Sequence, residues 1–282
     1  MTAKPASMPE PPIERSGDTI LPGEAFLADT PALRGHAGTQ PDLFLRWNAI
    51  PLAADAPAAI DIVVHLHGFS QQGGAMPLAE KVPRSGLDLT GCVRPTLALL
   101  PRGNWIRHTW YDFPDLLDGG VDRLVDYALA TFGGGRSLGV DRLILTAHSG
   151  GGMPAIDAIA GARRAPDELH IFDGLYGRDP AGGDPMRGME TIDSWLADRL
   201  GQEPHRPGAL RVVYIERQTG PFSRAVGAVI ARRLAGAEPG LAAALAPRYR
   251  VEPSGVPHGY VAAVCGPLLL ARADAEFDWS RV

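Results

Sequence analysis

The residue whose setting most clearly points to chemistry is Ser149, in the run Ala-His-Ser-Gly-Gly over residues 147–151. An apolar segment precedes this run and a helical pattern follows it. The residues two positions away from the serine, Ala147 and Gly151, are both small. A sharp strand-to-helix turn needs small residues there, because larger side chains would collide around a strained nucleophile. Such a turn would hold the hydroxyl above a sheet edge, at a helix N-terminus that favours developing negative charge. The simpler alternative is a Gly-rich helix start capped by Ser149.

The run resembles the nucleophile elbow of the α/β-hydrolase family, Gly-x-Ser-x-Gly, with Ala147 in place of the first glycine. A second segment is similar to another turn of that family. The apolar run over residues 62–66 is followed by His-Gly-Phe at positions 67–69. In the family, the turn after the third strand supplies one backbone donor of the oxyanion hole, and the residue after the nucleophile supplies the other. The resemblance therefore implies that the amides of Phe69 and Gly150 bind the oxyanion.

The family order of serine, acid and histidine places the general base near the C-terminus. His258 is the only one of the eight histidines beyond residue 205. It lies between the last predicted strand and the last predicted helix, where this family carries its base. We therefore expect His258 to take the proton of Ser149, because a serine hydroxyl is a weak nucleophile until a base removes that proton.

Two carboxylates compete for the role of triad acid. Glu216 ends the predicted seventh strand, which is where most of the family places the acid, but the usual Gly-x-x-Asp turn is missing. Asp173 ends the predicted sixth strand, directly before Gly174. A carboxylate at that strand end would point over the sheet edge toward His258. We favour Asp173, with Glu216 as the alternative; an ordinary turn at Asp173 would leave Glu216 in the role.

Two histidines at the end of a predicted strand, His65 and His67, raise the alternative of a metal site. Gly-Phe-Ser follows His67, so the acidic and histidine neighbours that a binuclear metal hydrolase needs are absent from this segment. Serine chemistry of this kind requires neither a metal nor an organic cofactor. We expect none in this protein.

Aromatic residues gather in two inserts near the predicted site. Trp105, Trp110 and Tyr111 lie in an insert over residues 104–118, and Tyr176 lies in a second insert over residues 174–189. Inserts after parallel strands lie near the active edge of the sheet, so these side chains could line an apolar substrate pocket. The alternative is that they fill the core of the loops.

Helical and strand patterns alternate along the chain. Strands are expected over residues 43–47, 59–66, 96–100, 143–147, 169–172, 212–215 and 249–251. Helices are expected over residues 121–132, 150–162, 192–200, 225–234 and 260–271. This alternation predicts an α/β fold, a mostly parallel sheet with helices on both faces. Four prolines in the first twelve residues predict a disordered tail over residues 1–22, followed by one α/β-hydrolase-like domain over residues 23–282.

Composition narrows the function. Of 282 residues, 45% are apolar, and the net charge of -5 gives no reason to expect nucleic acid as a partner. No apolar run is long enough to span a membrane, and no signal-peptide core is visible, so we expect a cytoplasmic protein. Two cysteines, Cys92 and Cys265, are too few for a disulfide framework and are expected to be free thiols.

These features together predict a serine hydrolase that cleaves a small-molecule carboxylic ester, as an esterase or lipase does. An acyltransferase or amidase with the same triad is an alternative, since the sequence does not distinguish water from another acceptor of the acyl group. A third possibility is a catalytically inactive hydrolase fold that serves as a binding module.

Overall fold

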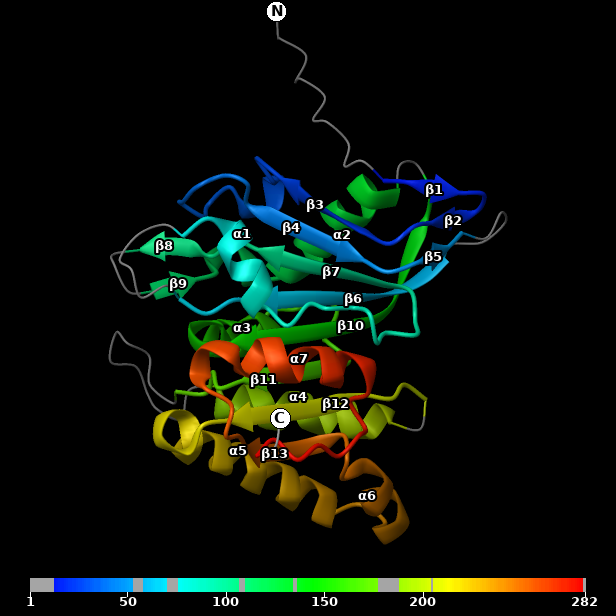
Figure 1. The fold of residues 1–282 in the computed structure, drawn as a ribbon. Helices are drawn as coiled ribbons and strands as arrows, with labels where there is room; N and C mark the ends of the chain where they lie inside the picture. Colours follow the sequence, from blue (N-terminus) through cyan, green and yellow to red (C-terminus); the bar gives the residue numbers. More distant parts are fainter. Residues whose placement is uncertain are drawn as a thin grey trace, which may run out of the picture.

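The centre of the computed structural model is an eight-stranded sheet with the order β13-β12-β11-β10-β6-β7-β4-β3 (Figure 1). The structure describes residues 13–52, 58–69, 76–106, 110–133, 136–176, 188–203 and 205–280. The strands of this sheet are β3 (Gly23–Leu27), β4 (Leu43–Trp47), β6 (Ala58–Leu66), β7 (Thr96–Pro101), β10 (Leu138–His148), β11 (Glu168–Phe172), β12 (Ala209–Tyr214) and β13 (Tyr249–Pro253). Six strands of this sheet run parallel to one another: β7, β6, β10, β11, β12 and β13. Strand β4 is antiparallel to both β7 and β3. The mostly parallel sheet predicted from the sequence is confirmed.

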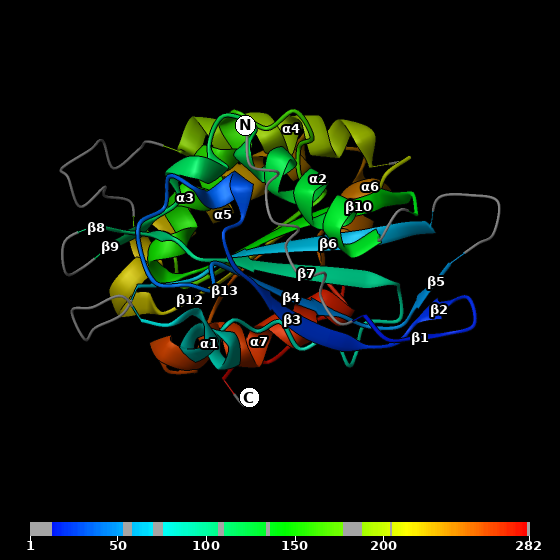
Figure 2. The same ribbon diagram turned by 90° about the horizontal axis from the view of Figure 1, so that it is seen from above.

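Helices cover both faces of the sheet (Figure 2). They are α1 (Leu78–Lys81), α2 (Gly120–Gly133), α3 (Gly152–Ala160), α4 (Met189–Gln202), α5 (Glu216–Ala235), α6 (Pro239–Leu245) and α7 (Val261–Ala271). Helices α1 and α7 lie on one face, and α2, α3 and α4 lie on the other. Outside the main sheet are the short strands β1 (Arg15–Ser16), β2 (Thr19–Ile20) and β5 (Ile50–Pro51), and the hairpin of β8 (Asn104–Ile106) and β9 (Trp110–Asp112).

Alternating side chains of the central strands enter the two layers of the core. In β6, Ile62 and Val64 pack with the apolar faces of α2 to α5, whereas Val63 packs in a second cluster with residues beside α1 and α7. In β11 and β12, Phe172 and Val213 join α7 in a third cluster. This two-residue period is typical of a sheet buried on both faces.

Because the six strands β6, β7, β10, β11, β12 and β13 are parallel, their carboxyl ends share one edge of the sheet. Counted along the chain within this sheet, β6 is the third strand, β10 the fifth, β11 the sixth and β12 the seventh. The chemistry-bearing segments singled out above follow β6, β10, β11 and β13. The fold therefore brings them to a common edge.

Two expectations about element boundaries were wrong. The predicted tail over residues 1–22 is too long, because strands β1 and β2 already pair within it and Ile20 is completely buried; residues 1–12 lie outside the described residues. The helix expected over residues 225–234 begins at Glu216 instead. Across the described parts of the chain, we find no helix long and apolar enough to cross a membrane. Cys92 and Cys265 are free thiols, as expected.

Candidate active site

Ser149 lies in a strained turn between β10 and α3. Its φ is +53°, a left-handed conformation that non-glycine residues seldom adopt and that costs about 1–3 kcal/mol. The small residue two positions later is required by close packing. A Cβ on Gly151 would lie 2.2 Å from the carbonyl oxygen of Leu66 in the neighbouring strand β6. The strand-to-helix turn expected from the sequence is therefore present, and it holds the serine at the carboxyl edge of the sheet.

The side chains of Ser149, His258 and Asp173 form one hydrogen-bonded chain. His258 follows β13 in a short 3-10 helix that leads into α7. Its Nε2 lies 2.8 Å from Ser149 Oγ, and its Nδ1 lies 2.6 Å from Asp173 Oδ2. A carboxylate can only accept, so Nδ1 carries the hydrogen and Nε2 is left to accept the serine hydroxyl. The sequence-predicted base and the favoured acid are thus in contact, on opposite ring nitrogens.

Asp173 is held by more than His258. Its φ is +46° and its side chain is fully buried at the end of β11. Its second carboxylate oxygen, Oδ1, accepts hydrogen bonds from the amide of Ile215 at 2.9 Å and from the hydroxyl of Thr219 at 2.5 Å. Burial raises the pKa of Asp173, but the hydrogen bonds from His258, Thr219 and Ile215 outweigh burial and leave this pKa below its usual value. Asp173 is therefore an ionised, oriented carboxylate.

The alternative acid does not reach the histidine. Glu216 is the first residue of α5, is exposed, and forms an ion pair with Arg224 on the same helix. Glu216 follows the seventh strand, where most of the family carries its acid, yet the carboxylate in contact with His258 follows the sixth strand. The sequence-based preference for Asp173 agrees with this geometry.

The backbone amides expected to form the oxyanion hole lie beside Ser149. An ideal Cβ on Gly150 would lie 3.7 Å from the amide nitrogen of Phe69, so the two segments pass close to each other. A Cβ on Gly68 would lie 2.7 Å from Ser149 Cβ, a distance that excludes any side chain at that position. The His-Gly-Phe turn after β6 is therefore pressed against the serine, and the amides of Phe69 and Gly150 flank it.

Comparison with known proteins gives a limited result. No protein-family model matches this sequence, and no curated protein matches it. Among solved structures, an S-formylglutathione hydrolase from Agrobacterium tumefaciens is 12% identical with a TM-score of 0.48, covering 93% of this chain and 97% of that one. Siderophore hydrolase EstA from Aspergillus nidulans is 13% identical with a TM-score of 0.43, covering 92% and 95%. A glucuronoyl esterase from Solibacter usitatus is 14% identical with a TM-score of 0.44, covering 97% and 88%.

The deciding observation is internal to the chain: a mostly parallel sheet whose fifth strand leads into a strained serine turn, with a histidine after the last strand. This topology is that of the α/β-hydrolase fold. The neighbours named above share little sequence with this chain, so their substrates are not transferred to it.

Three further histidines surround this site as neutral side chains. Burial, together with the neighbouring His258, lowers the pKa of His148 to about 4, and burial lowers the pKa of His65 to about 3. His148 Nε2 donates to the carbonyl oxygen of His258 at 2.8 Å and so fixes the backbone of that residue. His67 donates from Nδ1 to Gly68 O and accepts from the amide of Gly103 at Nε2. Both ring nitrogens of His67 are therefore engaged in loop contacts.

A cavity of about 400 Å³ opens next to Ser149. The turn after β6, the segment around α1, and the loops that carry Ser149 and His258 line it. Its charged lining side chains within the described residues are cationic, Lys81 and Arg84, and no carboxylate is among them. Of the predicted pocket residues, Tyr176 is 40% exposed and its hydroxyl lies 3.3 Å from Ser149 Oγ. The side chains of Trp105, Trp110 and Tyr111 lie outside the described residues.

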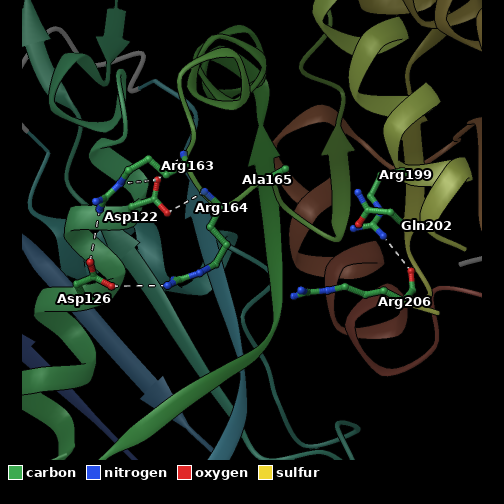
Figure 3. Close-up of a pocket in the computed structure, with 8 residues that line it drawn as sticks. All are labelled: Asp122, Asp126, Arg163, Arg164, Ala165, Arg199, Gln202 and Arg206. Carbon is green, nitrogen blue, oxygen red and sulfur yellow. Dashed lines mark hydrogen bonds and ion pairs between the residues drawn. The ribbon is translucent and has the colours of Figure 1, made fainter.

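A second hollow lies at the opposite edge of the sheet, before β11 and β12 (Figure 3). Arg163 and Arg164 pair there with carboxylates of α2, and Arg199 and Arg206 pair with Asp167. Among the residues that the structure describes, no serine, cysteine or histidine lines this hollow. Each of its four arginines is paired with a carboxylate, which makes this hollow a surface ion-pair network. Within the described ranges, no three His, Cys, Asp or Glu side chains are grouped as metal ligands.

Sequence reasoning missed three residues that build the site. Thr219 binds Asp173, His148 binds the backbone of His258, and Lys81 donates to the carbonyl of Gly68. Thr219 and Lys81 follow no motif. For His148 one signal was available, its place directly before Ser149, and its contact with His258 depends on the return of the chain after β13.

Proposed function

We propose that this protein is a serine hydrolase that cleaves carboxylic esters through an acyl-enzyme at Ser149. The observation that carries the proposal is the hydrogen-bonded chain from Ser149 Oγ through His258 to Asp173, at 2.8 and 2.6 Å. This arrangement matches the roles of nucleophile, general base and orienting acid. The backbone amides of Phe69 and Gly150 are proposed as the oxyanion donors.

In the acylation step, His258 Nε2 takes the hydroxyl proton while Ser149 Oγ attacks the ester carbonyl. The tetrahedral oxyanion accepts hydrogen bonds from Phe69 and Gly150. Asp173 keeps the hydrogen on Nδ1 and stabilises the imidazolium that forms. His258 then protonates the departing alcohol, which leaves the acyl group on Ser149.

Deacylation repeats the sequence with water in place of Ser149. His258 deprotonates the water, the oxyanion forms again at the same two amides, and Ser149 leaves with the proton returned by His258. The cavity beside the serine has a volume of about 400 Å³, which leaves room for a short acyl chain and a water molecule. Each proton has a defined carrier, so this route requires no metal ion or organic cofactor.

The test is turnover of a chain-length series of p-nitrophenyl esters by the wild type and by Ser149→Ala. We expect the wild type to show saturable release of p-nitrophenol and the variant to lose about 10⁴-fold or more of kcat. A p-nitroanilide tested in parallel reports amidase activity, and an added alcohol acceptor reports acyl transfer. Turnover of none of these substrates by folded wild type would favour the inactive binding module and contradict the proposal.

A further inference from the structure

Lys81, the last residue of α1, is an unusual buried lysine. It is 7% exposed, and the only other lysine of the chain, Lys4, lies outside the described residues. Lysine is rarely buried unless its ammonium group has a defined partner. Here Nζ donates to the carbonyl oxygen of Gly68 at 2.7 Å. A buried cation is thus directed at the peptide that carries one of the proposed oxyanion donors.

The Gly68 carbonyl accepts a second hydrogen bond, from His67 Nδ1 at 2.8 Å. The N–H of the same peptide group belongs to Phe69. The peptide bond between Gly68 and Phe69 is trans, so its C=O and N–H point to opposite sides. With the oxygen bound by Lys81 and His67, the Phe69 amide is directed to the other side of the peptide plane. The close approach of Phe69 N to Gly150 is consistent with that direction.

We propose that Lys81 is a positioning residue of the oxyanion hole, which holds and polarises the Gly68–Phe69 peptide so that the Phe69 amide donates more strongly to the oxyanion. This inference rests on the proposed function of the same site. A hydrogen bond from a charged donor is about twice as strong as a neutral one, and hydrogen bonds in a chain strengthen one another. Withdrawal of electron density at the carbonyl oxygen makes the N–H of that peptide a better donor. The benefit is largest when negative charge develops, that is, in the transition state.

The charge state of Lys81 agrees with this role. The pKa of Lys81 is lowered to about 8, chiefly by burial and also by Arg84, with Glu80 opposing both. Near pH 7 the side chain is therefore mainly a cation. The histidines that face it from β6 and β10, His67 and His148, are neutral because burial lowers their pKa values.

Lys81 also lines the cavity, which suggests an alternative: direct binding of an anionic substrate. The two roles affect different kinetic constants. Polarisation of the peptide acts on kcat for every ester, including uncharged ones. Direct binding acts on KM and only for esters that carry a negative charge. An uncharged substrate therefore separates them.

The experiment compares Lys81→Met with the wild type on p-nitrophenyl acetate and measures inhibition by phenylboronic acid, which forms a tetrahedral adduct with an active serine. We expect kcat to fall about tenfold, a part of the 10²–10³-fold that loss of a whole oxyanion donor costs. The inhibition constant should rise about tenfold, and KM should change less than about twofold. Arg34→Met is the control, because Arg34 is an exposed cation outside the cavity lining, and it should leave all three constants within about twofold of the wild type.

The proposal is overturned if Lys81→Met keeps kcat and the boronate inhibition constant within twofold of the control, or if its only defect is a raised KM for an anionic ester. If Lys81→Met does not fold, Lys81→Gln is measured instead, with the same expected direction and the same refuting results. Failure of the proposed function has a different signature, because the wild type itself would then not turn over esters.

Discussion

Substitution of Asp173 by asparagine changes one atom of the hydrogen-bonded chain of Ser149, His258 and Asp173. It tests whether Asp173 sets the tautomer of His258. In the wild type, Oδ2 of Asp173 accepts the Nδ1 hydrogen of His258, while Oδ1 accepts from Ile215 and Thr219. In Asp173→Asn, the amide oxygen keeps the place of Oδ1, because both groups there are donors. The amide nitrogen must then face His258 and donate to Nδ1. The imidazole is forced into the tautomer with hydrogen on Nε2, which cannot accept the proton of Ser149.

The expected loss in kcat is about 10⁴-fold, the size seen when a serine protease is left with the wrong histidine tautomer. The assay is p-nitrophenyl acetate hydrolysis at pH 7.5, with circular dichroism and a thermal melt to verify folding. Glu216→Gln is the matched control, because Glu216 is exposed and pairs with Arg224; it should stay within about twofold of the wild type. If Asp173→Asn keeps a near-normal kcat while Glu216→Gln loses most of it, the acid follows the seventh strand and the reasoning is wrong.

Two other predictions follow from the same contacts. Thr219→Val removes the hydroxyl that binds Asp173 and should lower the free energy of unfolding by about 1–3 kcal/mol at pH 7. Because the pKa of Asp173 is lowered in the folded state, this stabilisation is present above the ordinary aspartate pKa of about 3.9 and is lost as the pH falls through the folded value. Urea unfolding should therefore show a difference in the free energy of unfolding between wild type and Thr219→Val at pH 7 that narrows as the pH is lowered below the ordinary aspartate pKa; a difference that stays constant down to the pH of acid unfolding would contradict the argument. Prolonged dialysis against EDTA should leave esterase activity unchanged, and loss of activity that zinc or calcium restores would overturn the metal-free route.

Ser149, His258 and Asp173 could be predicted because each lies in a local sequence context that is typical of its proposed role. Ser149 needs small neighbours in a turn after a buried strand, and Ala147 and Gly151 are visible in the sequence. Asp173 directly follows an apolar strand, and His258 is the only histidine in the last quarter of the chain. The carboxyl ends of parallel strands lie at one edge of the sheet, so short local patterns were enough to predict that these three residues meet.

The supporting residues depend on tertiary placement that no short pattern records. Thr219 lies 46 residues from Asp173 and meets it because the first turn of α5 starts beside the end of β11. The helix was expected only from residue 225, and Pro221, which lies inside the observed helix, lacks an amide hydrogen. In the structure, the amides of Gln218 and Thr219 both donate to the carbonyl of Ile215, which starts the helix ahead of the proline.

The edge strand β3 was missed for a different reason. Ala25 and Leu27 face the core, but the outward residue between them, Phe26, is also apolar. The centroid of its ring lies 4.9 Å from that of Phe44. The alternation that marks a half-buried strand is therefore absent from this segment.

The most direct test of the account is covalent labelling by a fluorophosphonate probe followed by peptide mapping. The account predicts stoichiometric modification of the wild type at Ser149, no modification of Ser149→Ala, and strongly slowed modification of His258→Ala, because the hydroxyl then lacks its base. Labelling at another residue, or a folded wild type that does not react, would contradict the claim that Ser149, His258 and Asp173 form a working nucleophilic triad.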